Sequence, residues 1–254
     1  MDDKLNIKRV DNEELSQKTK RGLIASILQN AKDGKPFKLP NEEELALRLG
    51  VSRSALRDAL KSLEEVGIVT RRRSIGTIAN PLIAKESARL DIDPELFHLM
   101  KESGYDTRVE TLRLGFVFEK DAALGPEQDS YLNIEKVFYG NDMPLAYVAD
   151  HIAGSYVKDA KDSILTLQKI SHYQFLETYC NTTMAYTMAH IDAIIPEPWL
   201  KEIIHLQDGQ PVLQMEDYVY NFDHEIVAHS MIYFRNGSLD LKFLRKSWFV
   251  TKPS

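Results

Sequence analysis

Basic and hydroxyl side chains gather between residues 38 and 77 at spacings that suit contact with nucleic acid. Ser52, Arg53 and Arg57 stand at the start of an expected helix, and a run of arginines at 71–73 follows it. In a helix that enters the major groove, an arginine can bond O6 and N7 of guanine, and the helix N-terminus favours a phosphate. The arginine run would lie beside the DNA backbone or the minor groove. This stretch therefore predicts a DNA-contacting surface.

Three helices and a hairpin are expected to position these side chains. Apolar residues recur at helical spacing over 15–31, 41–50 and 52–67, and the last two segments begin with Asn or Ser and end with Gly, as capped helices do. The tight turn between the second and third helices is typical of a helix-turn-helix, and a hairpin over 68–79 would form a wing. A small helical domain with a solvated basic face is the alternative that the pattern leaves open.

The same stretch resembles the winged-helix DNA-binding domain of GntR-family bacterial transcription regulators. The matching segments are residues 39–46, 49–53, 56–60, 63–67 and 76–77. The resemblance implies that Arg53 and Arg57 read or anchor double-stranded operator DNA, and that Gly76 lets the wing approach the minor groove. The residues expected at the DNA are Lys38, Ser52, Arg53, Ser54, Arg57, Arg71, Arg72, Arg73, Gly76 and Thr77.

Two residues depart from the pattern of that family. The family usually has arginine in the middle of the acidic triplet, where this chain has Glu43, and glycine where this chain has Ser74. Because that arginine often contacts DNA, Glu43 is expected to remove a contact and to add repulsion toward the phosphates. The departures bear on operator sequence and affinity more than on the fold.

The second half of the chain changes from helical to strand patterns after residue 104. Strands are expected over 105–119, 131–139, 145–152, 183–195, 212–221, 226–235 and 242–250, with helices over 163–180 and 199–205. This order predicts an α+β protein in which an N-terminal winged helix-turn-helix precedes an α/β effector domain with a mainly antiparallel sheet. The predicted boundaries are 1–80 for the DNA-binding domain, 81–103 for a connector and 104–254 for the effector domain.

This half resembles the UTRA domain, the chorismate-lyase-like effector domain of the HutC-type subgroup of GntR regulators. The matching segments are residues 104–112, 140–146, 208–213, 226–230 and 233–235. Effectors of this domain are commonly small metabolites, often phosphorylated sugars, and a pair of arginines one residue apart commonly grips the phosphate. The resemblance therefore implies a small-molecule effector, either a sugar derivative or another metabolite.

The matching positions of this chain are less polar than those of the family. Lys136 and Phe138 stand where the arginine pair is usual, Val148 replaces a glutamate, and Phe234 replaces a tyrosine. Strand alternation is expected to place the candidate residues of each strand on a shared face. This predicts an effector other than a sugar phosphate, with ordinary core packing or a site without ligand as the alternatives. The residues expected at the effector are Lys136, Phe138, Val148, Asp150, Ser230 and Phe234.

Metal and cofactor chemistry is not expected. His190 lies two residues from Asp192, and His224 and His229 flank one hairpin, but no HExxH or paired CxxC pattern supports a metal site. The single cysteine, Cys180, excludes an internal disulfide and a cysteine-rich zinc site. Because the chain has no glycine-rich phosphate loop, no nucleotide cofactor is expected.

The charge of the chain is divided unequally. Residues 1–80 carry 16 Lys and Arg against 12 Asp and Glu, a net charge of +4, whereas 81–254 carry 16 against 26, a net charge of −10. A basic module joined to an acidic one is compatible with DNA binding despite the overall charge of −6. The 254 residues are 43% hydrophobic but contain no signal peptide or membrane-spanning apolar run, so a cytoplasmic protein without membrane contact is expected.

Three functions compete for this sequence. The favoured one is a homodimeric, effector-responsive transcription regulator, usually a repressor in this family, that meets two half-sites of a near-palindromic operator. The second is an enzyme with the chorismate-lyase-like fold, which the basic module and the absence of a convincing acid/base set disfavour. The third is a helical, metal-binding effector domain, which the strand patterns disfavour. We therefore expect a regulator and not an enzyme.

Overall fold

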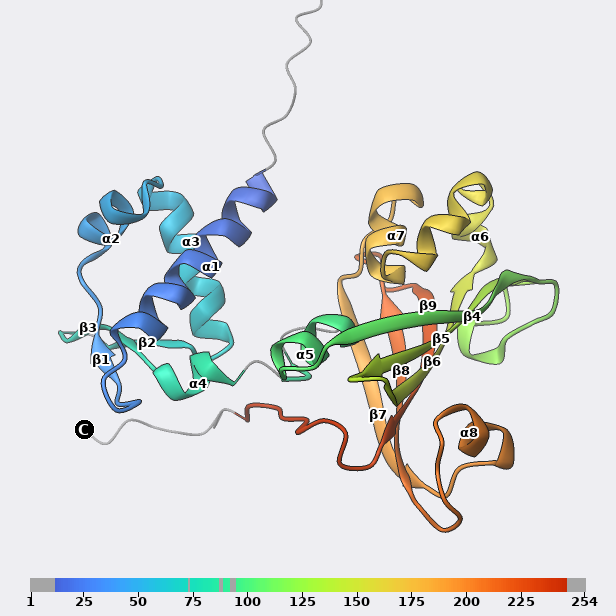
Figure 1. Cartoon of the computed structure of the whole chain (residues 1–254). Coiled ribbons are helices and arrows are strands. Elements are labelled where there is room, and N and C mark those ends of the chain that lie inside the picture. The colour runs from blue at the N-terminus through green and yellow to red at the C-terminus, as the bar shows by residue number, and fades with distance from the viewer. Residues whose placement is uncertain (1–11, 73, 87–88, 92–94, 246–254) are drawn as a thin grey trace, which may run out of the picture. The chain divides into compact units, whose positions relative to one another are not determined.

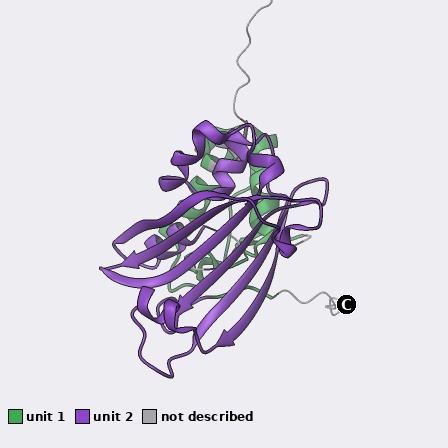
Figure 2. Cartoon of the chain, turned by 90° about the vertical axis from the view of Figure 1, so that its right-hand side faces the viewer, with its two compact units in different colours: residues 1–94, 242–254 green, residues 95–241 purple. Residues whose placement is uncertain are grey.

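The computed structural model describes residues 12–72, 74–86, 89–91 and 95–245. Contacts divide the chain into two compact units, residues 1–94 with 242–254 and residues 95–241 (Figure 2). The connector predicted over 81–103 therefore contributes to both units. Within the described segments, no helix combines the length and the apolar composition that crossing a membrane requires.

The first unit joins helices to a small sheet. Its elements are α1 (Asn12–Asn30), β1 (Phe37–Lys38), α2 (Glu42–Leu49), α3 (Arg53–Glu65), β2 (Val69–Arg72), β3 (Gly76–Ala79) and α4 (Pro81–Lys85) (Figure 1). The sheet is antiparallel with the order β1-β3-β2, so β2 and β3 form the hairpin that the sequence predicts as a wing. The core of the unit lies between α1, α2, α3 and this hairpin.

Side-chain caps set the turn between α2 and α3. Asn41 accepts a hydrogen bond from the backbone N–H of Glu44 (2.9 Å), and Ser52 accepts one from the N–H of Ala55 (3.1 Å), so each helix begins at a cap. Gly50 ends α2 in the left-handed region, with φ of +67°, a conformation that glycine adopts without steric cost. The helix-turn-helix predicted from the sequence is confirmed.

One face of α3 is buried in this core and the opposite face is exposed. Leu56, Ala59, Leu60 and Leu63 recur at helical spacing and are all buried. Their packing fixes the rotation of α3 about its own axis. The polar side chains of the helix are consequently directed outward.

The second unit contains a six-stranded sheet. Its elements are α5 (Leu96–Glu102), β4 (Thr107–Val117), η1 (Ala122–Leu124), β5 (Tyr131–Gly140), β6 (Met143–Ala153), α6 (Gly154–Val157), η2 (Lys161–Gln168), α7 (His172–Tyr179), β7 (Tyr186–Ile194), α8 (Pro198–Ile203), β8 (Val212–Tyr220) and β9 (Ile226–Arg235). All neighbouring strands are antiparallel, in the order β4-β5-β6-β9-β8-β7. The predicted antiparallel sheet is confirmed.

The two faces of this sheet are covered by different helices. On one face, Leu132 and Ile152 belong to a core that includes Phe175 of α7, and α6 and η2 pack there as well (Figure 1). On the other face, Val137 and Tyr147 pack with apolar residues of α8. Because side chains alternate along a strand, successive residues of β6 and β9 face these two environments in turn.

A two-residue turn and a β-bulge together fix the register of β5 and β6. Asn141 and Asp142 have φ of +51° and +65°, and two positive φ values in a row are what a two-residue hairpin of the favoured type requires. Next to the turn Tyr139 pairs with Pro144, and a bulge between Phe138 and Tyr139 then shifts the register by one residue, so that Lys136 lies opposite Val148. A shift of one residue would move every side chain of the strand to the opposite face, so the turn helps to decide which groups line the candidate site.

The helix predicted over 163–180 is interrupted. The helical turn η2 ends at Gln168, and α7 begins after Ser171, whose hydroxyl accepts a hydrogen bond from the N–H of Gln174. Because Ser171 is an N-cap, it starts a separate helix that can run in its own direction. The prediction of one continuous helix is therefore wrong.

The strand predicted over 242–250 is wrong for the part that the structure describes. After β9 ends, the chain turns at Gly237, which has φ of +73°. Lys242 then forms an isolated bridge with Arg89 and does not join the six-stranded sheet. Residues 246–250 of the predicted strand lie outside the described residues.

Candidate functional sites

The exposed face of α3 carries the arginines that are predicted to contact DNA. The side chains of Arg53 and Arg57 are 59% and 65% exposed. Ser54 is exposed beside them, while the hydroxyl of Ser52 is engaged in the N-cap. α3 is the second helix of the helix-turn-helix, the helix that such motifs place in the major groove with its first turn toward the base edges.

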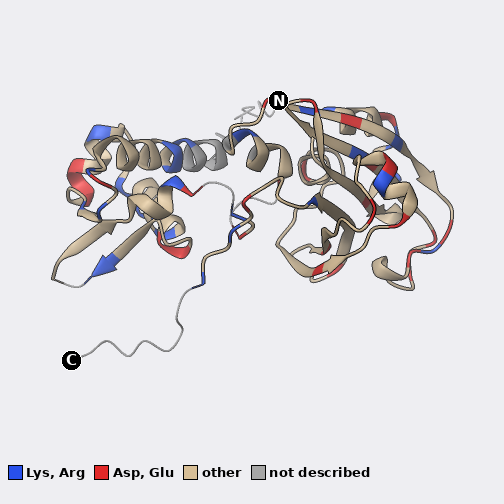
Figure 3. Ribbon diagram, turned by 60° about the horizontal axis from the view of Figure 1, so that its bottom comes forward, with Lys and Arg blue, Asp and Glu red and all other residues tan. Residues whose placement is uncertain are grey.

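Each of these arginines is paired with an acid of α2. Arg53 forms an ion pair with Glu43, and Nε of Arg57 donates to Glu42 Oε2 at 2.6 Å. Figure 3 shows both signs of charge on the ribbon of this unit, so its net positive charge does not make a uniformly basic surface. Exposed ion pairs contribute about 0–1 kcal/mol. DNA phosphates can therefore compete with the two carboxylates for the guanidinium groups.

The wing carries most of the other predicted DNA contacts. Arg71 and Arg72 are exposed on β2, where they pair with Thr77 and Gly76 of β3. Arg73 lies outside the described residues. The hairpin thus presents at least two guanidinium groups next to its turn.

Backbone conformation at the wing turn explains two residue types. Gly76 has φ of +106°, and a Cβ there would lie 3.2 Å from Cε of Lys38, so a larger residue would be strained and crowded. Ser74, where the family usually has glycine, also has a positive φ, of +69°. The wing is joined to α3, since the Arg71 guanidinium donates to the Arg57 carbonyl at 3.4 Å.

Replacing Glu43 with glutamine is expected to tighten DNA binding about threefold to tenfold, because the change frees Arg53 and removes a charge that repels phosphate. The measurement is fluorescence anisotropy of a labelled operator fragment at several salt concentrations. Glu44→Gln is the matched control, because it makes the same charge change on α2 but frees Arg48, which is outside α3. Equal effects of the two variants would contradict a specific role for Glu43.

The residues predicted at the effector all lie on the α7 side of the second unit's sheet. Lys136 is the register partner of Val148, and Asp150 is that of Ser230. Phe138 and Phe234 are the register partners of Ala146 on its two sides. The shared faces expected within each strand are therefore present. Phe138 is half-buried, and the other five are buried: Lys136, Val148, Asp150, Ser230 and Phe234.

Asp150 is the centre of a buried polar network. Its carboxylate accepts a hydrogen bond from Ser230 Oγ at 2.6 Å and lies 3.1 Å from His172 Nδ1. Burial alone raises the pKa of Asp150, but its contacts with His172, Ser230 and Lys136 outweigh this effect and leave the pKa below its usual value. Nζ of Lys136 donates to the carbonyl of Ile170 at 3.1 Å. The pKa of Lys136 is lowered, chiefly by burial.

Two buried polar groups of this face are missing from the sequence-based prediction. Asp217 of β8 is the register partner of Ser230 and is 4% exposed, and His172 begins α7. Oδ1 of Asp217 and Nε2 of His172 have no hydrogen-bond partner among the described residues. Burial raises the pKa of Asp217 to about 6. Strand alternation could have revealed Asp217, whereas no local pattern reveals which side chains α7 adds to the face.

Two family matches cover most of these elements. Residues 22–78 match the family described as bacterial regulatory proteins, gntR family, and residues 121–239 match the UTRA domain. The second match and the six-stranded sheet rule out the helical, metal-binding effector domain that the sequence left as a third possibility.

Relatives and solved structures agree with these matches. The chain is 24% identical over 201 residues to the histidine utilization repressor of Pseudomonas aeruginosa, which covers 75% of this chain and 76% of the relative. It is 23% identical over 199 residues to the HTH-type transcriptional repressor NagR of Bacillus subtilis. This match covers 78% of this chain and 81% of NagR. The fold is similar to that of the possible transcriptional regulator YydK from Bacillus subtilis, with a TM-score of 0.70 and 16% identity. The alignment covers 94% of this chain and 100% of YydK.

A further solved structure, PhnF from Mycobacterium smegmatis, has a TM-score of 0.56 and 17% identity, with coverage of 89% of this chain and 99% of PhnF. The matched families and the two curated relatives are regulators, and nothing among them supports the enzyme alternative. The chain therefore joins a DNA-binding domain of the gntR family of bacterial regulatory proteins to a UTRA domain, and it is a DNA-binding regulator that responds to a small-molecule effector.

Proposed function

We propose that this protein is a homodimeric repressor that acts in the cytoplasm on an operator close to its own gene. The observation that carries the proposal is the capped α3, which exposes Arg53 and Arg57 next to an arginine-bearing wing. Both curated relatives are repressors by name, which supports repression over activation. A two-fold dimer would present two such surfaces to the two half-sites of a near-palindromic operator.

The test is DNA binding at stated salt. Full-length protein is titrated, at about 100 mM salt, against the DNA upstream of its own gene and against a random fragment of equal length. We expect the upstream fragment to bind on the order of 1,000-fold more tightly. Sedimentation of the complex should give two chains per operator. Equal affinity for both fragments would refute the repressor proposal, and one chain per operator would refute the dimer.

We also propose that the effector binds at the polar face around Lys136 and Asp217. Lys136 offers a buried cation to an acidic group of the ligand. Asp217 offers a buried carboxylate whose Oδ1 lacks a donor among the described residues, so a ligand amine or hydroxyl would complete it. The apolar side chains of Val148 and Phe234 would contact the rest of the molecule. The fitting class is a small metabolite that combines a carboxylate and a hydrogen-bond donor with an apolar part, a combination that sugar phosphates lack.

A thermal-shift panel of amino acids, hydroxy acids and sugar phosphates tests this effector class, because a ligand that binds the folded state raises its apparent stability. We expect stabilisation by compounds of the first two kinds that exceeds the stabilisation by sugar phosphates. A hit should also change operator affinity, since an effector acts through its different affinity for the two states of the protein. Stabilisation by sugar phosphates alone would contradict the proposed chemistry.

Replacing Lys136 with methionine is expected to weaken binding of the acidic compound found in that panel by about tenfold or more, because a charge-assisted hydrogen bond is lost. Isothermal titration calorimetry measures the change. Lys158→Met is the control, because Lys158 is an exposed lysine of the same unit. An unchanged affinity in the Lys136 variant would move the effector site elsewhere.

A further inference from the structure

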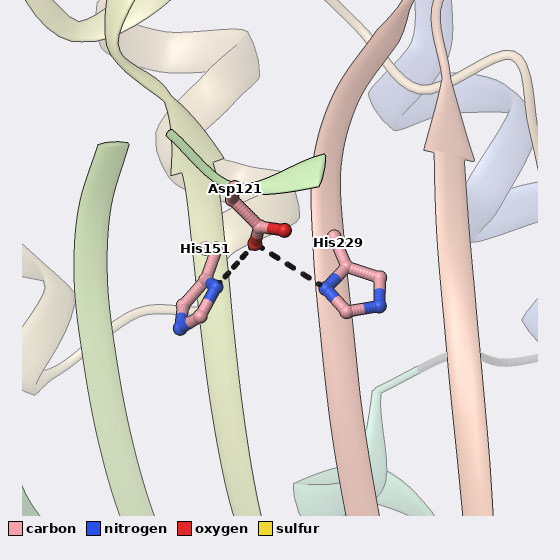
Figure 4. A group of neighbouring side chains, drawn as sticks. All are labelled: Asp121, His151 and His229. Carbon is pink, nitrogen blue, oxygen red and sulfur yellow. Dashed lines mark hydrogen bonds and ion pairs between the residues drawn. The ribbon is translucent and has the colours of Figure 1, made fainter. Parts of the chain in front are cut away.

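A second polar cluster lies on the sheet face that is opposite the proposed effector site. Asp121 caps η1, while His151 of β6 and His229 of β9 are register partners on neighbouring strands. One ligand-type atom from each of the three residues lies within 4.8 Å of the other two. Figure 4 shows the two imidazoles on either side of the carboxylate. Because the three residues are far apart in the chain, no spacing motif reveals them.

The Asp121 carboxylate is held with one oxygen directed at both imidazoles. Its Oδ1 accepts a hydrogen bond from the N–H of Ala123 at 2.9 Å, which fixes the side chain. Its Oδ2 lies 2.6 Å from Nδ1 of His151 and 3.7 Å from Nδ1 of His229. The ring of His151 is further positioned by the Tyr131 ring, with centroids 4.2 Å apart.

The hydrogen bonding of His229 leaves one ring nitrogen without a partner. Its Nε2 lies 3.0 Å from Oε1 of Glu216, and an ionised carboxylate only accepts, so Nε2 carries the proton. In the neutral imidazole, Nδ1 is then a bare lone pair. Nδ1 is buried, has no hydrogen-bond partner among the described residues, and faces Oδ2 of Asp121. Two electron-rich atoms so placed repel each other unless a cation lies near both.

We propose that Asp121, His151 and His229 bind a divalent transition-metal ion, of which Zn²⁺ is the reference case, through one carboxylate oxygen and two Nδ1 atoms. Two imidazole nitrogens and a carboxylate oxygen are a common donor set for such ions. Ligands at about 2.0–2.2 Å from a tetrahedral Zn²⁺ lie roughly 3.3 Å apart. The 3.7 Å between Asp121 Oδ2 and His229 Nδ1 is close to this value. The 2.6 Å contact between Asp121 Oδ2 and His151 Nδ1 must open by about 0.7 Å, and His151 must release the proton that it donates to Asp121 when the ion binds.

The surroundings of the cluster fit a metal ion in two further respects. Glu216 stands behind His229 as the outer carboxylate that commonly orients a metal-bound histidine. The His151 side chain is 25% exposed, so solvent can supply the remaining ligand. The ion would tie η1 to β6 and β9 at positions adjacent in sequence to Asp150 and Ser230, which face the other side of the sheet. This inference is independent of the repressor proposal.

The test is calorimetric titration of ZnCl₂ into tag-free, full-length protein from which metals have been stripped with EDTA and the chelator removed. We expect one tight Zn²⁺ per chain and a higher melting temperature with Zn²⁺ than without it. Substitution with Co²⁺ should give the visible absorption of a four- or five-coordinate site. Absence of stoichiometric Zn²⁺ binding would overturn the proposal and would leave a proton as the cation shared by these groups.

Variants locate the ion. Asp121→Asn keeps an oxygen for the Ala123 N–H but removes the charge, and His151→Gln changes a side chain at the rim, so both should keep the fold. Each is expected to weaken Zn²⁺ binding at least tenfold, with an unchanged circular dichroism spectrum in EDTA. His190→Gln is the control, because His190 is exposed on β7 and outside the cluster. Binding that survives both variants but not His190→Gln would also overturn the proposal.

Discussion

Replacing Arg53 and Arg57 together with alanine is expected to weaken operator binding on the order of 100-fold at about 100 mM salt. Both side chains project from the first turns of α3, where they are more than half exposed and where their apolar neighbours on the helix are buried. Removal of an arginine that bonds a guanine bidentately costs about 1–3 kcal/mol. The loss should therefore appear in affinity and not in folding.

The dependence on salt separates two roles of these arginines. If a guanidinium contacts a phosphate, its removal lowers the slope of log K against log salt by about one. If the guanidinium contacts a base edge, its removal lowers the ratio of operator affinity to random-DNA affinity, while the salt slope changes little. Measuring both single variants on both fragments assigns each arginine to one of these roles.

Arg48→Ala is the matched control for this experiment. Arg48 is also exposed and paired with an acid of α2, Glu44, but it lies on the first helix of the motif. We expect it to change operator affinity by less than the two α3 variants do. Wild-type affinity of the Arg53 and Arg57 double variant, with the fold intact by circular dichroism, would remove α3 as the recognition helix.

The first half of the chain could be predicted closely because its signals are local. The caps at Asn41 and Ser52, the glycine at position 50 and the apolar spacing of α3 each act within a few residues. The pairing of Glu43 with Arg53 could not be predicted, because it depends on how α2 packs against α3. From the sequence alone, Glu43 is expected only to weaken DNA binding. In the structure it is also the ion-pair partner of Arg53 on the recognition helix.

In the second half of the chain, the alternation of apolar and polar residues predicts the strands, but it does not predict which residues meet at the candidate effector site. Alternation places Asp150 beside Val148 on one face, yet it does not say that β9 lies between β6 and β8. That order brings Ser230 between Asp150 and Asp217. His172 reaches the same face only because Ser171 caps a separate helix there. Sequence reasoning therefore found the sheet and part of its polar lining, and missed what sheet order and helix packing add.

Replacing Asp217 with asparagine is expected to stabilise the protein by up to about 3 kcal/mol at pH 7.5, which corresponds to roughly 6–12 °C in melting temperature. Burial raises the pKa of this carboxyl to about 6, from an ordinary value of 3.8. Between these values the folded state binds more protons than the unfolded state. Stability therefore falls as the pH rises from about 4 to about 6 and stays lowered above it.

Melting temperatures of the Asp217 variant and the wild type, measured from pH 4 to pH 8, check this sign. The advantage of the variant should be smallest near pH 4, where Asp217 is neutral in the folded state and only about half ionised in the unfolded state, and should grow up to about pH 6 to 7. Asp208→Asn is the control, because it removes the same charge from an exposed side chain of the same unit. A destabilised Asp217 variant at pH 7.5 would contradict the prediction.

The same variant connects stability with effector binding. A buried carboxylate that lacks a donor destabilises the folded chain, and such a group is retained at a cost when a ligand uses it. A ligand that donates to Asp217 would remove this cost on binding, so wild-type protein should gain more stability from the effector than the asparagine variant does. Equal stabilisation of both proteins by the same ligand would show that the effector does not contact Asp217. A smaller shift in the variant, together with its higher starting stability, would assign the carboxylate to the effector.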